Sequence, residues 1–297
     1  MTIRVYALFA ALLLVSCASS PPKYSNSDIT SADTRQQQIQ LYESLEAELN
    51  AKPSAKNAQI YQEMLTQLGL LIAADEITRI RQELESSMVL SGFVPLSVIS
   101  DTWTSASQLS KWDKSQYETL IDELKQYQSL TEKAISDERN LLGALQPGSD
   151  PVGRVEILER ISLLYGDNAE ANEAYTFTYE QVRNDLSMQG ETSMQRMDFA
   201  HALAAYESLK RLDPEYPGID ALISRTRTGL DAGNFRNLLV NGDIEGAYEA
   251  FLEISRRDLN VTEKREFLGP SHNLAKYFES NAEILTDSGQ YAGAYNS

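Results

Sequence analysis

Few side chains in this 297-residue chain have the chemistry of catalytic or metal-binding groups. There is one cysteine, Cys17, and there are two histidines, His201 and His272, which lie far apart in the sequence. A zinc site needs several Cys, His or carboxylate ligands at short spacings, and no His-Glu-x-x-His segment or group of cysteines accompanies either histidine. We therefore expect no metal site and no other cofactor.

The motifs of common hydrolases and nucleotide-binding enzymes are also missing. The sequence contains no Gly-x-Ser-x-Gly elbow, Gly-rich phosphate loop or dinucleotide fingerprint. Ser20-Pro-Pro-Lys23 has Ser-x-x-Lys spacing, but it lies in a stretch rich in Ser and Pro that cannot hold a base rigidly. These absences favour a protein that is not an enzyme.

One class of enzyme remains as an alternative. Glu85, Glu207 and Glu279 are each followed by serine, which resembles the catalytic dipeptide of lytic transglycosylases. Those cell-wall enzymes are helical and are sometimes lipoproteins. None of the three pairs is followed by the Gly- and Gln-containing segment of that family. A chain with 43 acidic residues forms such pairs by chance on solvated helix faces.

Cys17 stands at the end of an apolar N-terminal segment. Arg4 gives a positive start, and residues 5–15 form an apolar run that suits a signal peptide but is too short for a transmembrane helix, which needs about 20 residues. Leu14-Val-Ser-Cys17 then resembles the lipobox of bacterial lipoproteins. The resemblance implies that the signal, residues 1–16, is removed, that Cys17 carries diacylglycerol, and that the new amino terminus is acylated. Two or more acyl chains anchor a protein durably.

The residue after the cysteine and the net charge bear on location. In Gram-negative lipoproteins Asp at this place usually retains the protein in the inner membrane, so Ala18 implies the outer membrane, with the protein facing the periplasm. The formal charge of −17 excludes nucleic acid as a partner and disfavours anionic headgroups. We expect attachment through the lipid on Cys17 alone. Residues 17–31, polar and rich in Ser and Pro, are expected to form a flexible tether of about 20 Å.

The rest of the chain has helical periodicity. Apolar residues recur every three or four positions through the N-terminal helical region, residues 32–146, with the longest pattern over 113–145. Residues 89–112, which hold both tryptophans, are the least regular and predict a short helix between loops. Residues 146–151 break the pattern with Pro and Gly. No segment alternates with period two, so we expect an all-α fold.

The second half, residues 150–297, contains an internal repeat. Segments that begin at Ile157, Ala202 and Ala247 are 45 residues apart, and each has apolar residues four and seven places on. These further positions are Ile161, Tyr206 and Phe251, then Leu164, Leu209 and Ile254. A fourth copy begins at Ala294, so the last repeat is incomplete.

The repeat resembles the second helix of a tetratricopeptide repeat. In that family a small residue of this helix is followed four places on by an aromatic residue, and a proline closes the unit. Four residues of this chain match the pattern: the aromatic Phe199 at the turn before the helix, the small Ala202, the aromatic Tyr206 and the closing Pro214. The resemblance implies a helix-hairpin array, an α-solenoid, with a groove that binds a protein or peptide. The period of 45 to 47 residues exceeds the usual 34 or so, and Leu259 replaces the closing proline. A helical bundle with coincidental spacing is the alternative.

The same register gives candidate partner-binding residues. When the family's first-helix pattern is placed on it, Asn184 and Lys276 fall at the second position and Arg236 at the ninth. The resemblance implies that such residues hold a peptide backbone or carboxylate. The sequence therefore predicts a lipid-anchored interaction scaffold or accessory subunit of the bacterial cell envelope. A lytic transglycosylase and a purely structural envelope spacer are the alternatives.

Overall fold

A computed structural model describes residues 21–146, 148–257 and 261–287. Every regular element in these ranges is a helix, and the only strand-like pairing among them is an isolated bridge between Val89 and Phe93. The expected all-α fold is confirmed. The lipobox with Cys17, the following Ala18 and the fourth repeat at Ala294 lie outside the described residues.

The chain divides into two compact units, each described by itself. The first contains the chain up to Ala144 together with Ile157–Asn172, and the second contains Leu145–Glu156 and the chain from Glu173 onward. The chain first passes between units beside the Pro- and Gly-containing break at 146–151. It passes twice more, inside two helices, between Glu156 and Ile157 and between Asn172 and Glu173.

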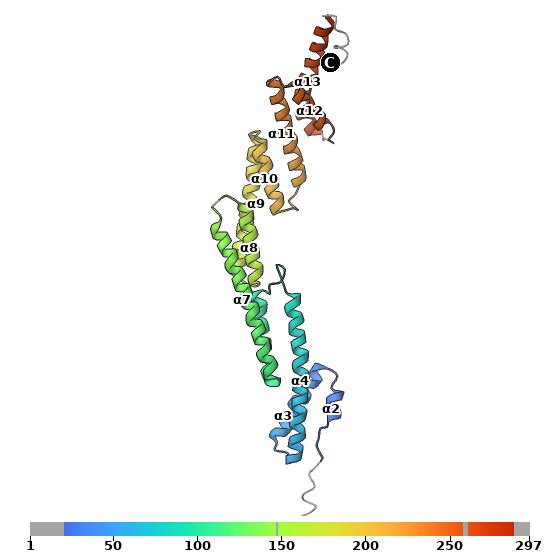
Figure 1. Ribbon diagram of the computed structural model, residues 1–297, viewed down its shortest axis with the longest axis vertical. Coiled ribbons are helices and arrows are strands. Elements are labelled where there is room, and N and C mark those ends of the chain that lie inside the picture. Colours follow the sequence, from blue (N-terminus) through green and yellow to red (C-terminus); the bar gives the residue numbers. More distant parts are fainter. Residues whose placement is uncertain (1–20, 147, 258–260, 288–297) are drawn as a thin grey trace, which may run out of the picture. The chain divides into compact units, whose positions relative to one another are not determined.

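In the first unit the longest helix runs without a break from Ala55 to Ser86. The segment between Leu71 and Ile77 contains neither Gly nor Pro, so nothing interrupts the helix there. This helix buries residues along its whole length, in two apolar clusters. The unit's helices (Figure 1) are α2 (Asn26–Ser31), α3 (Arg35–Asn50), α4 (Ala55–Ser86), α5 (Leu96–Ala106), α6 (Leu109–Trp112), α7 (Lys114–Ala144) and the last part of α8 (Pro151–Tyr165).

The second half of the expected tether is folded. Residues 26–31 form α2, and Ser25 and Asp28 make reciprocal capping hydrogen bonds at its start. Ile29 is buried in the cluster that α3 and α4 share. Tyr24 and Ala32, on either side of α2, pack in the same cluster, so three apolar residues in a polar, Ser-rich stretch attach this short helix to the unit.

In the second unit short helices alternate with long ones (Figure 1). Three repeat positions lie in the interior of this unit: Ala202 and Ala247 are both fully buried, and Tyr206 is 1% exposed. Phe251 is half-buried and packs beside Ala247. The helices are the first part of α8, α9 (Ala169–Gln195) from Glu173 onward, α10 (Phe199–Leu212), α11 (Ile219–Val240), α12 (Ile244–Ser255) and α13 (Val261–Asp287).

The turns before α10 and α12 have the same backbone structure. Met197 N–H donates to the carbonyl three residues back (3.0 Å) and Asp198 N–H to the carbonyl five residues back (2.9 Å). Gly242 and Asp243 make the same two bonds at 3.2 and 2.9 Å. Each turn is a Schellman motif whose last residue is the aspartate N-cap of the next helix. The 45-residue period of the sequence therefore recurs in the structure at these turns.

Candidate functional site

Helix α11 lines two hollows of the second unit, one on each side of it. Successive residues of a helix are about 100° apart, so Arg225, Gly229 and Arg236 share one face, and Arg227 and Asp231 lie on the other. The first face lines a hollow of about 270 Å³, and the second lines one of about 610 Å³.

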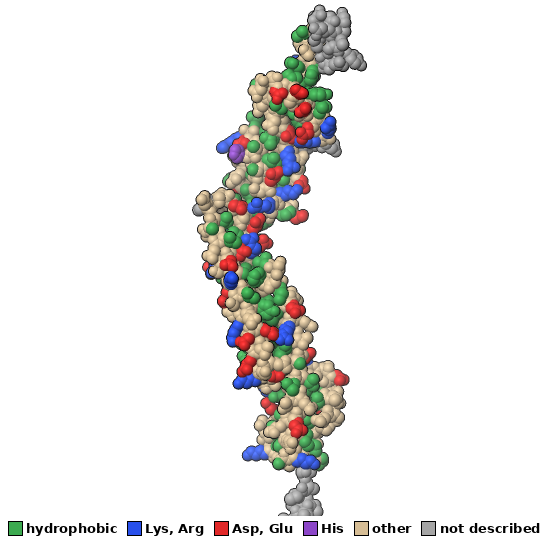
Figure 2. Space-filling view, in the orientation of Figure 1, with side chains coloured by type: hydrophobic (Ala, Val, Ile, Leu, Met, Phe, Trp, Pro, Cys, Tyr) green, Lys and Arg blue, Asp and Glu red, His purple; other side chains and the backbone are tan. Residues whose placement is uncertain are grey.

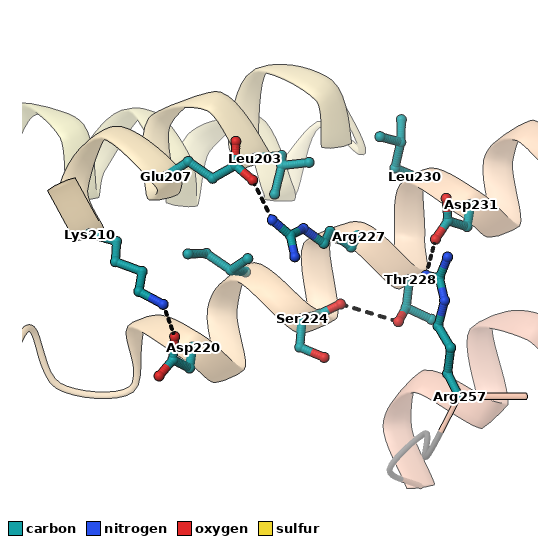
Figure 3. Close-up of a pocket in the computed structure, with 11 residues that line it drawn as sticks. Leu203, Glu207, Lys210, Asp220, Ser224, Arg227, Thr228, Leu230, Asp231 and Arg257 are labelled. Atoms are coloured by element: carbon teal, nitrogen blue, oxygen red, sulfur yellow. Dashed lines mark hydrogen bonds and ion pairs between the residues drawn. The ribbon is translucent and has the colours of Figure 1, made fainter. Parts of the chain in front are cut away.

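Charged side chains line the larger hollow in pairs of opposite charge (Figure 3). Its apolar lining comes from Leu203, Ile223 and Leu230. The pairs are Glu207 with Arg227 at 2.6 Å, Lys210 with Asp220 at 2.7 Å, and Asp231 with Arg257. Every acidic or basic side chain that lines this hollow thus has a partner of opposite charge. The pairs join α10 to α11 and α11 to the residues after α12, and they leave no net charge for a ligand.

Arg257 is the most firmly held of these cations. Its hydrogen bond with Asp231 raises the pKa of the guanidinium, and Glu253, to which it donates at 3.0 Å, raises the pKa further. The ion pair between α11 and the end of α12 therefore persists at any physiological pH. We assign this hollow a structural role in joining the helices.

The smaller hollow has a different composition. Its walls carry Met194, Met197 and Phe199, and its α11 face carries Arg225 and Arg236. Arg236 is exposed and forms no ion pair or hydrogen bond through its side chain with any described residue. A Cβ at Gly233 would meet no atom within 4 Å, so backbone lies open in the floor. The hollow combines an available guanidinium with flexible apolar walls.

The three predicted partner-binding residues lie on three different helices. Asn184 is exposed on α9, Arg236 on α11 and Lys276 on α13, and of these only Arg236 lines the smaller hollow. Asn184 lies on one face of α9 between Phe177 and Met188, which are 69% and 60% exposed. The structure gives no contact that brings the three residues together.

The sequence analysis missed Arg225. The signal was present in the series Arg225, Gly229, Gly233 and Arg236, whose spacings of four, four and three place the residues on one face of a helix. Two small residues between two arginines on one face indicate a recess with cationic ends.

The residues considered for catalysis lie on the surface of the described part. Glu85, Glu207 and Glu279 are exposed, and Glu207 pairs with Arg227. His201 is exposed, with its Nδ1 2.7 Å from Asp198 Oδ2, and His272 is exposed. Among the described residues there is no group of three or more His, Cys, Asp or Glu side chains that could hold a metal ion.

The most buried carboxylate of the described residues is Glu76 on α4, whose side chain is 5% exposed. Its oxygens lie 2.7 Å from Arg35 Nη2 and 2.6 Å from Arg79 Nη2. Two arginines thus neutralise this carboxylate, and the arrangement joins the start of α3 to α4.

No helix in the described ranges is both long enough and apolar enough to cross a membrane. Comparisons of the chain with known protein families, with curated proteins and with solved structures found no match.

Proposed function

We propose that the protein is a lipid-anchored interaction scaffold or accessory subunit of the bacterial cell envelope, and that the smaller hollow beside α11 binds part of a partner protein. One observation carries the proposal: Arg236 lines a recess and its guanidinium pairs with no described residue, in a chain whose formal charge is −17. An exposed arginine held next to a recess can bind a carboxylate with two parallel hydrogen bonds.

The walls of this hollow suit a polypeptide partner. Met194 and Met197 are unbranched and polarisable, so they adapt to different side chains, and Met197 is 73% exposed. The open backbone at Gly233 allows a partner chain to approach α11 closely. Lipid attachment rests on the lipobox resemblance of Leu14-Val-Ser-Cys17, and the outer membrane rests on Ala18; together they would hold the scaffold at one surface of the envelope.

The two parts of the proposal can be tested separately. A photo-crosslinking amino acid at Met197 should capture a defined partner in intact envelopes. Arg236→Glu should abolish that capture, because it places a second negative charge where a carboxylate binds. Arg154→Glu is the matched control, since Arg154 is an exposed arginine of the same unit that lines neither hollow. Equal capture by the Arg236→Glu and Arg154→Glu proteins would refute the role of this hollow.

The anchor is tested by Cys17→Ser. The variant should leave the membrane fraction and yet retain capture through Met197 when the envelope extract is kept concentrated. Mass spectrometry of the unaltered protein should show diacylglyceryl and acyl additions on Cys17. A Cys17→Ser protein that still fractionates wholly with membranes would show that the lipid is not the anchor.

A further inference from the structure

The first unit has a hollow that the proposed function does not use. It measures about 320 Å³ and lies between α5 and α7. Leu96, Ile99, Ser100 and Trp103 of α5 form one side, and Gln128 and Glu132 of α7 form the other. A volume near 300 Å³ is at the lower limit of ligand pockets and suits one long side chain or a small molecule.

The charge of this hollow is uncompensated. Glu132 is exposed and forms no ion pair with any described Lys or Arg, and no basic side chain lines the hollow. Gln128 Nε2 donates to Glu132 Oε1 at 2.8 Å, which orients the carboxylate and leaves its second oxygen available. The polar side of the hollow therefore presents an acceptor that carries a negative charge.

Trp103 supplies the aromatic wall. The side chain is half-buried and packs against the apolar core that α4, α5 and α7 share, so its ring is held in place. Its indole N–H donates to no described residue. The face of an indole attracts cations more strongly than that of any other aromatic side chain, and the attraction increases where water is partly excluded.

We infer that this hollow binds the lysine or arginine side chain of a partner polypeptide. The inference rests on the proposed function, since the partner protein supplies the side chain. The alkyl stem would lie against Leu96 and Ile99, and the charged head would lie between the Trp103 ring and the Glu132 carboxylate. The net charge of −17 attracts basic segments over a distance, which raises the rate of encounter.

Two other ligand classes fit the charge less well. A sugar would use the Trp103 face and the polar groups, but it carries no positive charge and so lacks the stronger, charge-assisted hydrogen bond that a cation makes with Glu132. The quaternary ammonium of a lipid headgroup would satisfy the charge but has no N–H with which to bond the free carboxylate oxygen. Lysine and arginine carry both the charge and the donors.

Trp103 can report binding directly, because Trp112 is the only other tryptophan. In the full lipidated chain in detergent, Trp112→Phe leaves Trp103 as the single emitter. This protein would be titrated with acetylated, amidated Gly-Ser peptides that carry one Lys, Arg or norleucine. Lys and Arg peptides should give a saturable change in emission that weakens with salt. The norleucine peptide, similar in shape but uncharged, should bind at least about tenfold more weakly.

Variants then locate the interaction. Glu132→Gln should lower the affinity for the lysine peptide by about tenfold or more, because it removes the charge of the side chain and keeps its shape. Asp137→Asn is the matched control, an exposed acid of the same helix outside the hollow. Circular dichroism of all proteins should be unchanged, since both positions are exposed.

Several outcomes would overturn the inference. Equal binding of lysine and norleucine would reveal an apolar site, and tighter binding of choline would assign the hollow to a lipid headgroup. Saturation by N-acetylglucosamine at lower concentration than lysine would assign it to a sugar. If no peptide gives a saturable change in Trp103 emission, the hollow is not a binding site for these side chains. None of these titrations involves the envelope crosslinks at Met197, so failure here leaves the proposed function standing.

Discussion

Tyr206 of α10 lies directly against Gly190 of α9. A Cβ added at Gly190 would lie 2.4 Å from Tyr206 Cε1 and 2.7 Å from Cζ, far inside van der Waals contact. Tyr206 is 1% exposed, so protein covers its ring and the ring cannot turn into solvent without displacing neighbouring side chains. The absence of a side chain at position 190 is therefore what allows α9 and α10 to pack at this distance.

This relationship predicts that Gly190→Ala destabilises the second unit. Overpacking of an enclosed site costs about 1–3 kcal/mol, which outweighs the gain of up to about 1 kcal/mol from replacing a helical glycine with alanine. Gly143→Ala in α7 is the control, because a Cβ there meets nothing within 4 Å. Urea unfolding should show a loss of stability for Gly190→Ala and a gain for Gly143→Ala. A gain for both would mean that Tyr206 moves freely.

The equivalent turns before α10 and α12 carry Met197 and Gly242 at the same position, and we expect substitutions at these two residues to change stability in opposite directions. Met197 has φ 59° and Gly242 has φ 76°, a region that favours glycine. Met197→Gly should therefore be neutral or stabilising by up to about 1 kcal/mol, although glycine also makes the unfolded chain more flexible. Gly242→Ala should destabilise by about 1 kcal/mol, because a left-handed conformation is costly for a residue with a Cβ. Thermal unfolding of the two variants measures the difference, and a stabilised Gly242→Ala protein would contradict the equivalence of the turns.

Much of the helical structure could be predicted from the sequence, because buried helix faces repeat every three or four residues. The 45-residue repeat singles out Ala202, Tyr206 and Ala247 by this spacing, and all three are buried. The ends of the helices were harder to predict. The polar, Ser-rich composition of residues 17–31 predicted a flexible tether, although residues 26–31 form α2.

The interactions that join different helices could not be predicted in the same way. Glu76 and Arg35 pair because α3 packs against α4, and no local pattern records which distant arginine a buried carboxylate meets. The same holds for Trp103 and Glu132, which line one hollow from α5 and α7. Arg236 could be predicted from the repeat register. Arg225, which lines the same hollow, could be predicted only by examining which residues share one face of α11.

The buried carboxylate gives a prediction for the first unit. Glu76→Gln should destabilise it by about 1–2 kcal/mol, because the change removes charge-assisted hydrogen bonds to Arg35 and Arg79, whose side chains are 39% and 48% exposed and so regain part of that energy from water. Glu83→Gln is the control: Glu83 is half-exposed and pairs only with Arg79, at 3.0 Å, so its loss should cost less than about 1 kcal/mol. Hydrogen exchange should show the larger effect in α3 and α4. Equal, small effects of both variants would mean that water reaches Glu76 freely.

Tyr206 also predicts how stability depends on pH. Burial raises the pKa of its phenol, with Glu191 and Tyr216 acting in the same direction and Arg225 opposing them. The folded state therefore holds this proton more tightly than the unfolded chain, whose tyrosines titrate near pH 10. The free energy of unfolding should fall as the pH rises above about 10, and it should not depend on this group below that pH. Tyr206→Phe should remove this part of the alkaline loss, so the stability difference between the two proteins should be constant from pH 6 to 9 and then shift in favour of the variant.

Ala247 provides the sharpest test of how the repeats pack. It is fully buried in a cluster with Phe235 of α11, Ile254 of α12 and Leu274 of α13. Ala247→Trp must push these helices apart, since close-packed helix axes are about 8–10 Å from each other and small residues at the contact set the lower limit. The loss should be at least about 1–3 kcal/mol, the usual cost of overpacking, and larger for so bulky a residue.

The damage from Ala247→Trp should also be local. Helices in a repeat array depend mainly on their neighbours, so amide exchange should accelerate in α11, α12 and the described part of α13. Protection in α7, which belongs to the first unit, should be retained. Tyr248→Trp is the control, because Tyr248 is the next residue of α12 and is 45% exposed. If Ala247→Trp is no more damaging than Tyr248→Trp, residue 247 does not face the packed interior, and the 45-residue register does not describe how these helices meet.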